Sequence, residues 1–473
     1  MKVRNWFYIL GVVTILALSG SYATYIWLDE APDDLLRYVE RRLLGHPKLE
    51  TVFMPLVKWT REQLISPSRE VVVSTSCLYY AERDKHMAAM GAVGPPRQHQ
   101  SGSVIKVGPH QKLSRIADAA RVAKNGDVVE IEAGEYLNDV ASWTQNDLQI
   151  RGVGGRVRII STGPTAEGKA IWVIHGDNIV IENVSFYGGR AHDLNGAGIR
   201  HQGKRLTVRD SFFEGNEMGV MTWNNDAAEL RIIRSEFCGN ATAEQHKQTD
   251  PGHQIYVGAI ARFELRDSYI HHGAFGHLVK SRARENHIYN NRLTDEINGR
   301  ASYELEFPNG GLAYVVGNII QQSSSTDNGK IIVYGAEGYR WPRNELYLVN
   351  NTLVDERVMG GRFLTVRPGP VKLNVVNNLI LGKRSRYDAI PDDSGANYTA
   401  KWSEVAFAQR QDYRLRVDST LLGKALDPGF ANASPVALKR EYVHPLSSRA
   451  LNGVPIHPGA LQQLAPATIN SAR

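Results

Sequence analysis

Two octets near the middle of the chain share one frame but differ in the residues that could do chemistry. GHQIYVGA begins at residue 252 and GHLVKSRA at residue 276; the second has Lys280 in place of Tyr256 and Arg282 in place of Gly258. Arginine and lysine can neutralise a carboxylate, and lysine and tyrosine can exchange protons with a reacting group. Together on one surface, these residue types would suit removal of a proton beside the carboxylate of an acidic sugar.

The alternation of residue types predicts which surface these side chains share. If the apolar Ile255 and Val279 face a core, their neighbours face outward. The same alignment of the preceding and following segments predicts one outward stripe, made of Arg200, Gln202, Trp223, Gln254, Tyr256, Lys280, Arg282, Glu304 and Glu306. Aromatic side chains beside charges of both signs are the residue types that an acidic polysaccharide site needs.

We predict different roles for different members of this set. Lys280, Arg282, Tyr256 and Glu306 are predicted to be catalytic, and Arg200, Gln202, Trp223, Gln254, Glu304, His271 and His272 to bind substrate. Removal of the sugar proton by these residues requires no cofactor. Asp250, Glu304 and Glu306 could nevertheless hold Ca²⁺, which prefers carboxylate oxygens. The alternative interpretation is a solvated strand face with an ordinary ion pair between Lys280 and Glu306.

The residues around the octets form a repeat, which must position these side chains. Short strands with alternating apolar residues each reach a turn position, and these positions, 23 to 33 residues apart, are Asn183, Asp210, Arg234, Asp267, Asn290, Gly317, Asn350 and Asn377. A drifting period of this length with period-2 alternation indicates a β-solenoid. We expect the asparagine and aspartate side chains to stack from coil to coil. The predicted fold class is therefore all-β, a right-handed parallel β-helix (solenoid).

Both ends of the repeat resemble a known superfamily. Residues 105–136, IKVGPHQKLSRIADAARVAKNGDVVEIEAGEY, resemble the opening of the pectin-lyase-like β-helix superfamily, in which an N-terminal cap helix covers the first coil. Residues 412–429 and 456–462 resemble the tail of its bacterial members. Locally, Val279-Lys280-Ser281 resembles the motif that supplies the base in Lys/Arg polysaccharide lyases of the chondroitin and alginate lyase type. Their second motif, Leu-Arg-His, is replaced here by Leu305-Glu306-Phe307.

The resemblance implies a polysaccharide lyase, and other functions stay open. Glu304 and Glu306, two apart on one strand face, would lie ~7 Å from each other, which fits an inverting glycoside hydrolase. A uronate epimerase is a further alternative. A non-catalytic glycan-binding or scaffold protein would need only the aromatic and basic groups.

The N-terminal part of the chain differs from the repeat in its pattern of apolar and charged residues. Lys2 and Arg4 precede an uncharged run from Trp6 to Trp27. This pattern predicts a transmembrane signal anchor, or a removable signal peptide, with the body outside the cytoplasm. The predicted domains are the anchor (1–30), a juxtamembrane region of short amphipathic helices with a linker (31–102), the β-helix (103–382) and a tail segment (383–473).

Composition limits the partners. Lys plus Arg exceed Asp plus Glu by only 6 and are spread along the chain, so we expect no nucleic acid as partner. From the outward stripe we expect an acidic polysaccharide as partner, and from the N-terminal run we expect membrane contact. We expect a monomer. Cys77 and Cys238 show neither a metal-ligand spacing nor a disulfide framework.

Overall fold

The structure, a computed structural model, describes the two ends of the chain incompletely. It describes residues 47–64 and 102–465, with gaps at 164, 241–251, 274–275, 297–298, 327, 358–359, 386, 391–396, 409–410 and 427–435, and also Leu43 and Cys77. The predicted anchor, residues 1–30, lies outside this part. Helix α3 (Pro47–Leu64) falls within the predicted juxtamembrane region. None of the described helices combines the length and apolar composition needed to cross a membrane.

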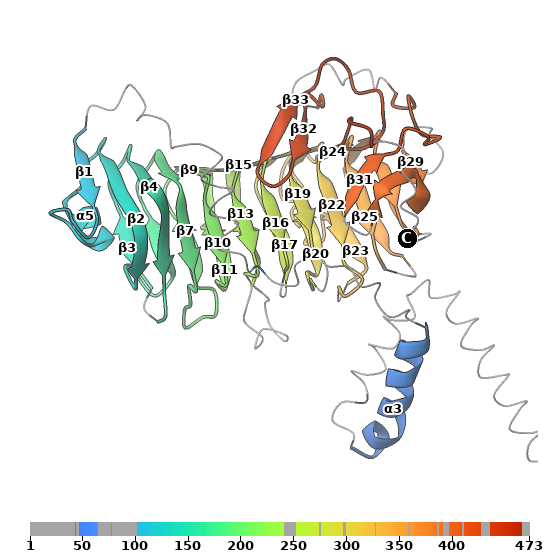
Figure 1. Ribbon diagram of the computed structural model, residues 1–473, viewed down its shortest axis with the longest axis horizontal. Helices are drawn as coiled ribbons and strands as arrows, with labels where there is room; N and C mark the ends of the chain where they lie inside the picture. Colours follow the sequence, from blue (N-terminus) through green and yellow to red (C-terminus); the bar gives the residue numbers. More distant parts are fainter. Residues whose placement is uncertain are drawn as a thin grey trace, which may run out of the picture.

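The body is a coil of short strands, each hydrogen-bonded in parallel to its equivalent one turn later, as Figure 1 shows. A nine-stranded sheet contains β3 (Ala141–Trp143), β5 (Ala170–Ile174), β8 (Ala197–His201), β11 (Met218–Thr222), β14 (Ile255–Val257), β17 (His277–Ser281), β20 (Tyr303–Phe307), β23 (Lys330–Tyr334) and β26 (Arg362–Val366). The prediction of a parallel β-helix is confirmed.

A 20-stranded sheet forms the rest of the wall, and most coils contribute two strands to it. It contains β1 (Val104–Val107), β2 (Val128–Leu137), β4 (Gln149–Ile160), β6 (Ile179–Glu182), β7 (Val184–Tyr187), β9 (Arg205–Arg209), β10 (Phe212–Glu214), β12 (Asn225–Ile233), β13 (Glu236–Cys238), β15 (Ile260–Arg266), β16 (Tyr269–His271), β18 (Glu285–Tyr289), β19 (Arg292–Thr294), β21 (Leu312–Val316), β22 (Ile319–Gln322), β24 (Glu345–Val349), β25 (Thr352–Asp355), β27 (Lys372–Val376), β28 (Leu379–Leu381) and β29 (Tyr398–Ala400).

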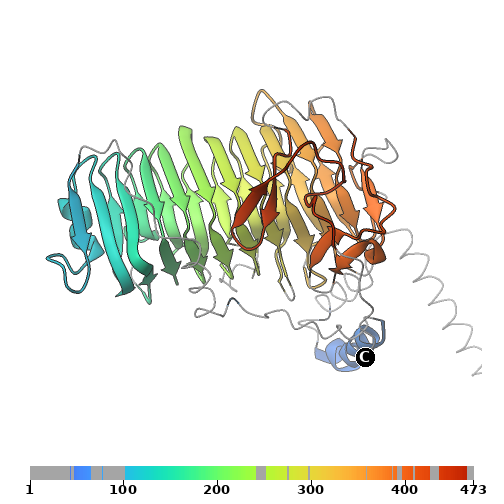
Figure 2. The same cartoon turned by 45° about the horizontal axis from the view of Figure 1, so that its top comes forward.

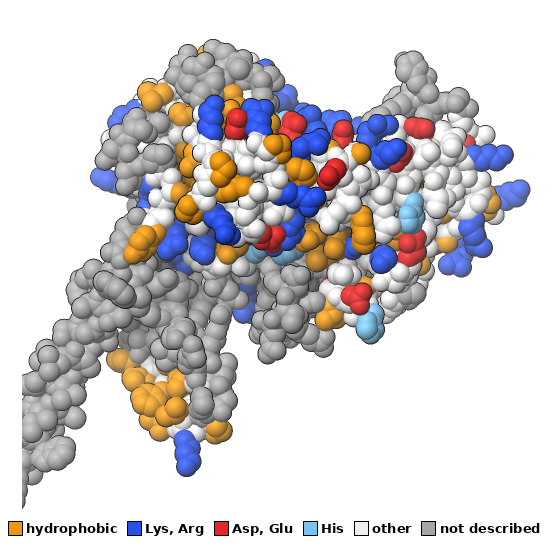
Figure 3. Space-filling model, turned by 180° about the vertical axis from the view of Figure 1, so that it is seen from behind, with side chains coloured by type: hydrophobic (Ala, Val, Ile, Leu, Met, Phe, Trp, Pro, Cys, Tyr) orange, Lys and Arg blue, Asp and Glu red, His pale blue; other side chains and the backbone are white. Residues whose placement is uncertain are grey.

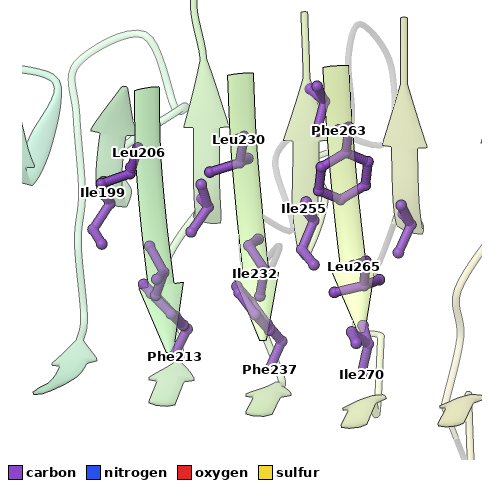
Figure 4. Close-up of a cluster of buried hydrophobic side chains, with 14 of the residues drawn as sticks. Ile199, Leu206, Phe213, Leu230, Ile232, Phe237, Ile255, Phe263, Leu265 and Ile270 are labelled. Carbon is purple, nitrogen blue, oxygen red and sulfur yellow. The ribbon is translucent and has the colours of Figure 1, made fainter. Parts of the chain in front are cut away.

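The core consists of apolar columns that run along the helix axis. Val220, Ile255, Val279 and Leu305 are partners in successive strands, and each is 0% exposed. Opposite them, Phe186, Phe213 and Phe237 form stacked ring pairs, with centroids 5.0 and 4.4 Å apart. Figure 4 shows aliphatic and aromatic side chains from several coils pointing into this interior. Repetition of side-chain type from coil to coil gives each layer a matching neighbour.

An asparagine ladder fixes one corner of the coil, one residue later than expected. All of the predicted turn positions, for example Asn290, have a positive φ and bend the chain. The ladder is made by the residues that follow, Asn291, Asn318, Asn351 and Asn378. The side-chain amide of each of the first three donates to the side-chain oxygen of the next at 3.0 Å. Each amide also donates to a main-chain oxygen in the neighbouring coil, so its buried polar atoms are paired.

A helix covers the first coil, and the tail packs along the outside of the later coils. Helix α5 (Ile116–Val122) lies against the first coil, and the Asp139 carboxylate accepts hydrogen bonds from its first two main-chain amides at 2.6 and 2.9 Å. The tail contributes η2 (Trp402–Glu404) and two antiparallel pairs, β30 (Val405–Phe407) with β31 (Asp412–Leu415) and β32 (Arg440–Val443) with β33 (Ser447–Ala450). Figure 2 shows the β32–β33 hairpin lying along the outside of the coils.

Candidate functional site

The parallel register brings several of the predicted residues into one outward column. Arg200, Met221, Tyr256, Lys280 and Glu306 are successive partners on β8, β11, β14, β17 and β20. Adjacent strands in a sheet lie about 4.8 Å apart, so each side chain can reach the next. Figure 3 shows basic, acidic and hydrophobic side chains interspersed on the rear face of the molecule.

Arg282 and Lys280 share one carboxylate, that of Glu337. The Arg282 guanidinium donates through Nε and Nη2 to the two oxygens of Glu337, at 2.9 and 2.6 Å. Lys280 Nζ lies 3.2 Å from the same carboxylate and 3.2 Å from that of Glu306. Arg282 Nη1 also donates to the Tyr256 hydroxyl at 2.5 Å, and its guanidinium lies 5.1 Å from the centre of that ring. The two cations therefore form a bidentate carboxylate clamp beside a phenol.

The charges of the clamp follow from its contacts. Burial alone would raise the pKa of Glu337, but the hydrogen bonds from Arg282 and the charge of Lys280 outweigh it and lower the pKa. Burial would likewise raise the pKa of Glu306, but His277 and Lys280 lower it. Both carboxylates are therefore ionised at neutral pH.

A stack of neutral rings forms the edge of the cluster. His253, His277 and Tyr303 are neighbours on successive coils, and their ring centroids lie 4.7 and 4.4 Å apart. Burial lowers the pKa of both histidines, most strongly that of His253. His277 Nε2 lies 3.1 Å from a Glu306 oxygen, so this imidazole can donate to the carboxylate while neutral.

The aromatic and basic residues of the earlier coils lie in line with the clamp. The Arg200 guanidinium is 5.7 Å from the centre of the Trp223 ring, which is 56% exposed. Burial lowers the pKa of Arg200, although Tyr256 partly counteracts it. Gln202 is half-buried just beyond the end of β8. The exposed indole offers a flat apolar surface on which a sugar ring could stack.

Two residues predicted on this face point into the protein instead. Gln254 and Glu304 are both 0% exposed. The Gln254 side chain accepts from Asn240 Nδ2 at 2.7 Å and donates to the main-chain oxygen of His271. Strict alternation fails here because two consecutive residues at the beginning of these strands face inward, as Leu278 and Val279 do on β17.

The remaining predicted residues do not join the clamp. His271 and His272 lie at the end of β16, in the other sheet, beside Glu236. Asp250 lies outside the described residues. Because Glu304 faces inward, the predicted Glu304–Glu306 pair of a hydrolase is not formed on the surface. The same orientation removes Glu304 from the Ca²⁺ site predicted there.

Sequence reasoning missed the residue that completes the clamp. Glu337 lies in the loop between β23 and β24, outside the strand repeat, between Gly335 and Gly338, which have φ of +82° and +99°. The Trp341 indole in the same loop donates to the Arg282 main-chain oxygen at 3.1 Å. The two glycines in this loop could have indicated a tight turn. The sequence does not show which residues Glu337 contacts.

Comparisons with known proteins add the following. No family model matches the sequence, and no curated protein matches it. Among solved structures, it is similar to pectate lyase Pel9A, with 13% identity and a TM-score of 0.47 over 76% of this chain and 96% of that one. It is also similar to the PL6 family alginate lyase AlyGC, with 15% identity and a TM-score of 0.34 over 59% of this chain and 41% of that one.

A third similar structure is the pectin methylesterase from Aspergillus niger, with 12% identity and a TM-score of 0.25 over 67% of this chain and 95% of that one. These solved structures thus include polysaccharide lyases and an esterase. The strands of the present chain pair in parallel from coil to coil. This pairing gives the chain the parallel β-helix fold that the pectin-lyase-like superfamily shares.

Proposed function

We propose that this protein acts on an acidic polysaccharide at the surface formed by Tyr256, Lys280 and Arg282, and that the reaction is β-elimination. One observation carries the proposal. Arg282 and Lys280 together hold a carboxylate, that of Glu337, in the way they would hold the carboxylate of a uronic acid. The Tyr256 hydroxyl is hydrogen-bonded to the same guanidinium, so a proton-transfer group stands next to the place where the acid would bind.

Each group has a role in this reaction. Arg282 would neutralise the uronate carboxylate, which makes the C5 proton easier to remove. Lys280 and Tyr256 flank that position: Tyr256 would accept the C5 proton, and Lys280, a cation paired with two carboxylates, would donate a proton to the leaving oxygen. The C4–O bond breaks and a C4–C5 double bond forms, so the proton gained and the proton donated balance. Trp223 and Arg200 would bind neighbouring sugars along the same column.

Binding without turnover is the second candidate. It is favoured by one observation: Lys280 is already paired with two carboxylates, and Arg282 with one. A cation so neutralised is better suited to hold an anion in exchange for Glu337 than to accept a proton.

A panel of uronic-acid polymers separates these functions. Ultraviolet absorbance of unsaturated ends indicates a lyase, new reducing ends without that absorbance indicate a hydrolase, and retention on the immobilised polymer without either indicates a binder. Arg282→Ala should lower turnover by at least about 100-fold, the cost of removing a group that stabilises developing charge. The matched control is Arg343→Ala, because Arg343 also makes a bidentate pair, with Glu345, and is 56% exposed.

Two results count against the site. If Arg282→Ala and Lys280→Ala both keep wild-type turnover and binding on the preferred polymer, the clamp is only an ion-paired surface. If Arg343→Ala is as damaging as Arg282→Ala, the loss reflects general charge and not this site.

The proposal also places the body outside the cytoplasm. A disulfide joins Cys77 and Cys238, and disulfides persist in oxidising compartments. Alkylation of intact cells with a maleimide, before and after reduction, should modify the two cysteines only after reduction. Modification without reduction would contradict this localisation.

A further inference from the structure

The two cysteines of the chain lie against a pair of histidines. Cys238 ends β13, His271 ends β16, and the two residues are partners in the parallel register. The ligand atoms of Cys238, His271 and His272 all lie within 4.8 Å of one another. Cys77 is bonded to Cys238, so its sulfur reaches the same place. Two sulfurs and two imidazoles therefore converge on one point, in the other sheet from the clamp.

The histidines are oriented as metal ligands usually are. The Glu236 carboxylate lies 3.0 Å from His271 Nε2 and therefore accepts its proton. Nδ1 of His271 then carries a lone pair, and it faces His272 Nδ1 at 2.6 Å. A carboxylate that fixes the far nitrogen of an imidazole is the usual partner of a metal-bound histidine.

Two of the four residues, Cys238 and His271, are fixed by the fold. Cys238 is 0% and His271 4% exposed, and the His271 ring stacks on Tyr269 with centroids 3.7 Å apart. The His271 main-chain oxygen accepts a hydrogen bond from Gln254. A site whose ligands are fixed before the ion arrives loses little entropy on binding.

We propose that Cys77, Cys238, His271 and His272 form a Cys2His2 zinc site whenever the disulfide is reduced, so that the disulfide and the zinc complex are alternative forms of one cross-link. A thiol reductant would convert the disulfide into two thiols and would itself be oxidised to a disulfide. Zn²⁺ would then displace one proton from each thiol, and the proton shared between the two Nδ1 atoms would pass through solvent to Nε2 of His272, so that both imidazoles stay neutral and both Nδ1 lone pairs can bind the ion. Two thiolates and two imidazoles are a complete tetrahedral set for zinc.

Metal binding by the purified full-length chain tests the inference. Reduced protein, desalted after incubation with zinc sulfate, should retain about one equivalent of zinc, and oxidised protein should retain none. Co²⁺ added to the reduced protein should give the visible bands of a tetrahedral site and a thiolate charge-transfer band. His272→Ala should abolish the tetrahedral spectrum, and Glu236→Gln should weaken zinc binding by about 10- to 100-fold. His175→Ala is the matched control, because His175 also contacts a carboxylate, that of Glu167 at 2.7 Å.

Cys77→Ser tests the zinc site even if a variant in the core of the coils folds poorly. Cys77→Ser changes a residue outside the β-helix, so the coils should melt as in the reduced wild type, while the charge-transfer band should fall to about half. The inference is overturned if reduced protein retains no more zinc than oxidised protein. It is also overturned if Cys77→Ser or His272→Ala, folded by its circular dichroism, binds zinc like the wild type.

Discussion

At the scale of single residues, Glu304 is a carboxylic acid buried between apolar side chains. Its neighbours at the equivalent position of the adjacent coils are Leu278 and Ile331, both 0% exposed. Burial, helped by the nearby charge of Asp295, raises the pKa of Glu304 well above its usual range. Burial therefore favours the protonated carboxyl in the folded protein, whereas the carboxyl of the unfolded chain ionises at its ordinary pKa.

We predict that Glu304→Gln stabilises the protein at neutral pH, because glutamine is uncharged at every pH and does not have to take up a proton on folding. The sign follows from the raised pKa: the stability of the protonated acid is fully present below the ordinary carboxyl pKa and declines as the pH rises above it. Urea unfolding should therefore show a larger gain at about pH 8 than at about pH 5. A gain that is equal at both pH values, or a loss at the higher one, would contradict a buried neutral acid.

Glu337 competes with any carboxylate ligand for the same clamp. We predict that Glu337→Gln raises the affinity for the preferred acidic glycan by about tenfold, because Arg282 and Lys280 no longer have to give up an ion pair. Isothermal titration should show the gain in Kd. Glu345→Gln, which breaks the comparable pair with Arg343, should leave the affinity unchanged; a weaker affinity in Glu337→Gln would mean that Glu337 itself contacts the ligand.

The site residues differed in how well the sequence predicted their positions. Alternation along the strand placed Tyr256, Lys280 and Glu306 in one column, because those positions obey the period of two. Alternation failed for Gln254 and Glu304, because two consecutive side chains face inward near the start of these strands. Glu337 reaches the clamp through a loop, and loop contacts depend on packing that a repeat pattern does not contain.

At the scale of elements, the asparagine ladder joins the coils at one corner. Asn318 is 0% exposed; its amide donates to Ile288 at 2.9 Å and to Asn351 at 3.0 Å, and its oxygen accepts from Asn291. The sequence predicted such a ladder but placed it on the preceding residue, since a turn rich in Asn and Asp does not show which member bends and which one bonds.

We predict that Asn318→Ala costs about 2–4 kcal/mol, because it leaves buried donors and acceptors of two coils without partners. Chemical denaturation monitored by circular dichroism measures the cost. Asn225→Ala is the control, since the Asn225 side chain bonds only to the exposed amide of Ala227 at 3.1 Å among the contacts described here. Equal losses in both variants would show that the ladder adds nothing beyond one local hydrogen bond.

At the scale of the whole molecule, the tail is attached to the coils through a buried polar layer. Arg292 and Glu296 lie beneath the tail; Arg292 donates to Glu296 at 3.2 Å and to Gln411 of the tail. Burial would raise the pKa of Glu296, but the charge of Arg292 and hydrogen bonds from Thr294 and Tyr269 lower it to about 2. The resemblance of residues 412–429 to bacterial tails gave no sign of this layer, because its partners are far apart in the sequence.

One acid of this layer should make attachment of the tail depend on pH. The Tyr413 hydroxyl of β31 donates to Glu356 at 3.2 Å, and burial together with the charge of Glu296 raises the pKa of Glu356 to about 7 from 4.5. The stability that comes from protonated Glu356 is therefore present below about pH 4.5 and is lost as the pH rises through about 7. Ionisation places a second negative charge beside Glu296 under the tail.

We predict that Glu356→Gln, which is neutral at every pH, flattens the decline of the melting temperature between about pH 5 and pH 8. Limited proteolysis should show the same effect locally: in the wild type the tail is cut faster at the higher pH, and in Glu356→Gln the two rates are alike. Glu135→Gln, at an exposed position on β2, should retain the wild-type profile. If Glu356→Gln retains it too, another group controls the response, and Glu304, whose raised pKa acts in the same direction, is the next to replace.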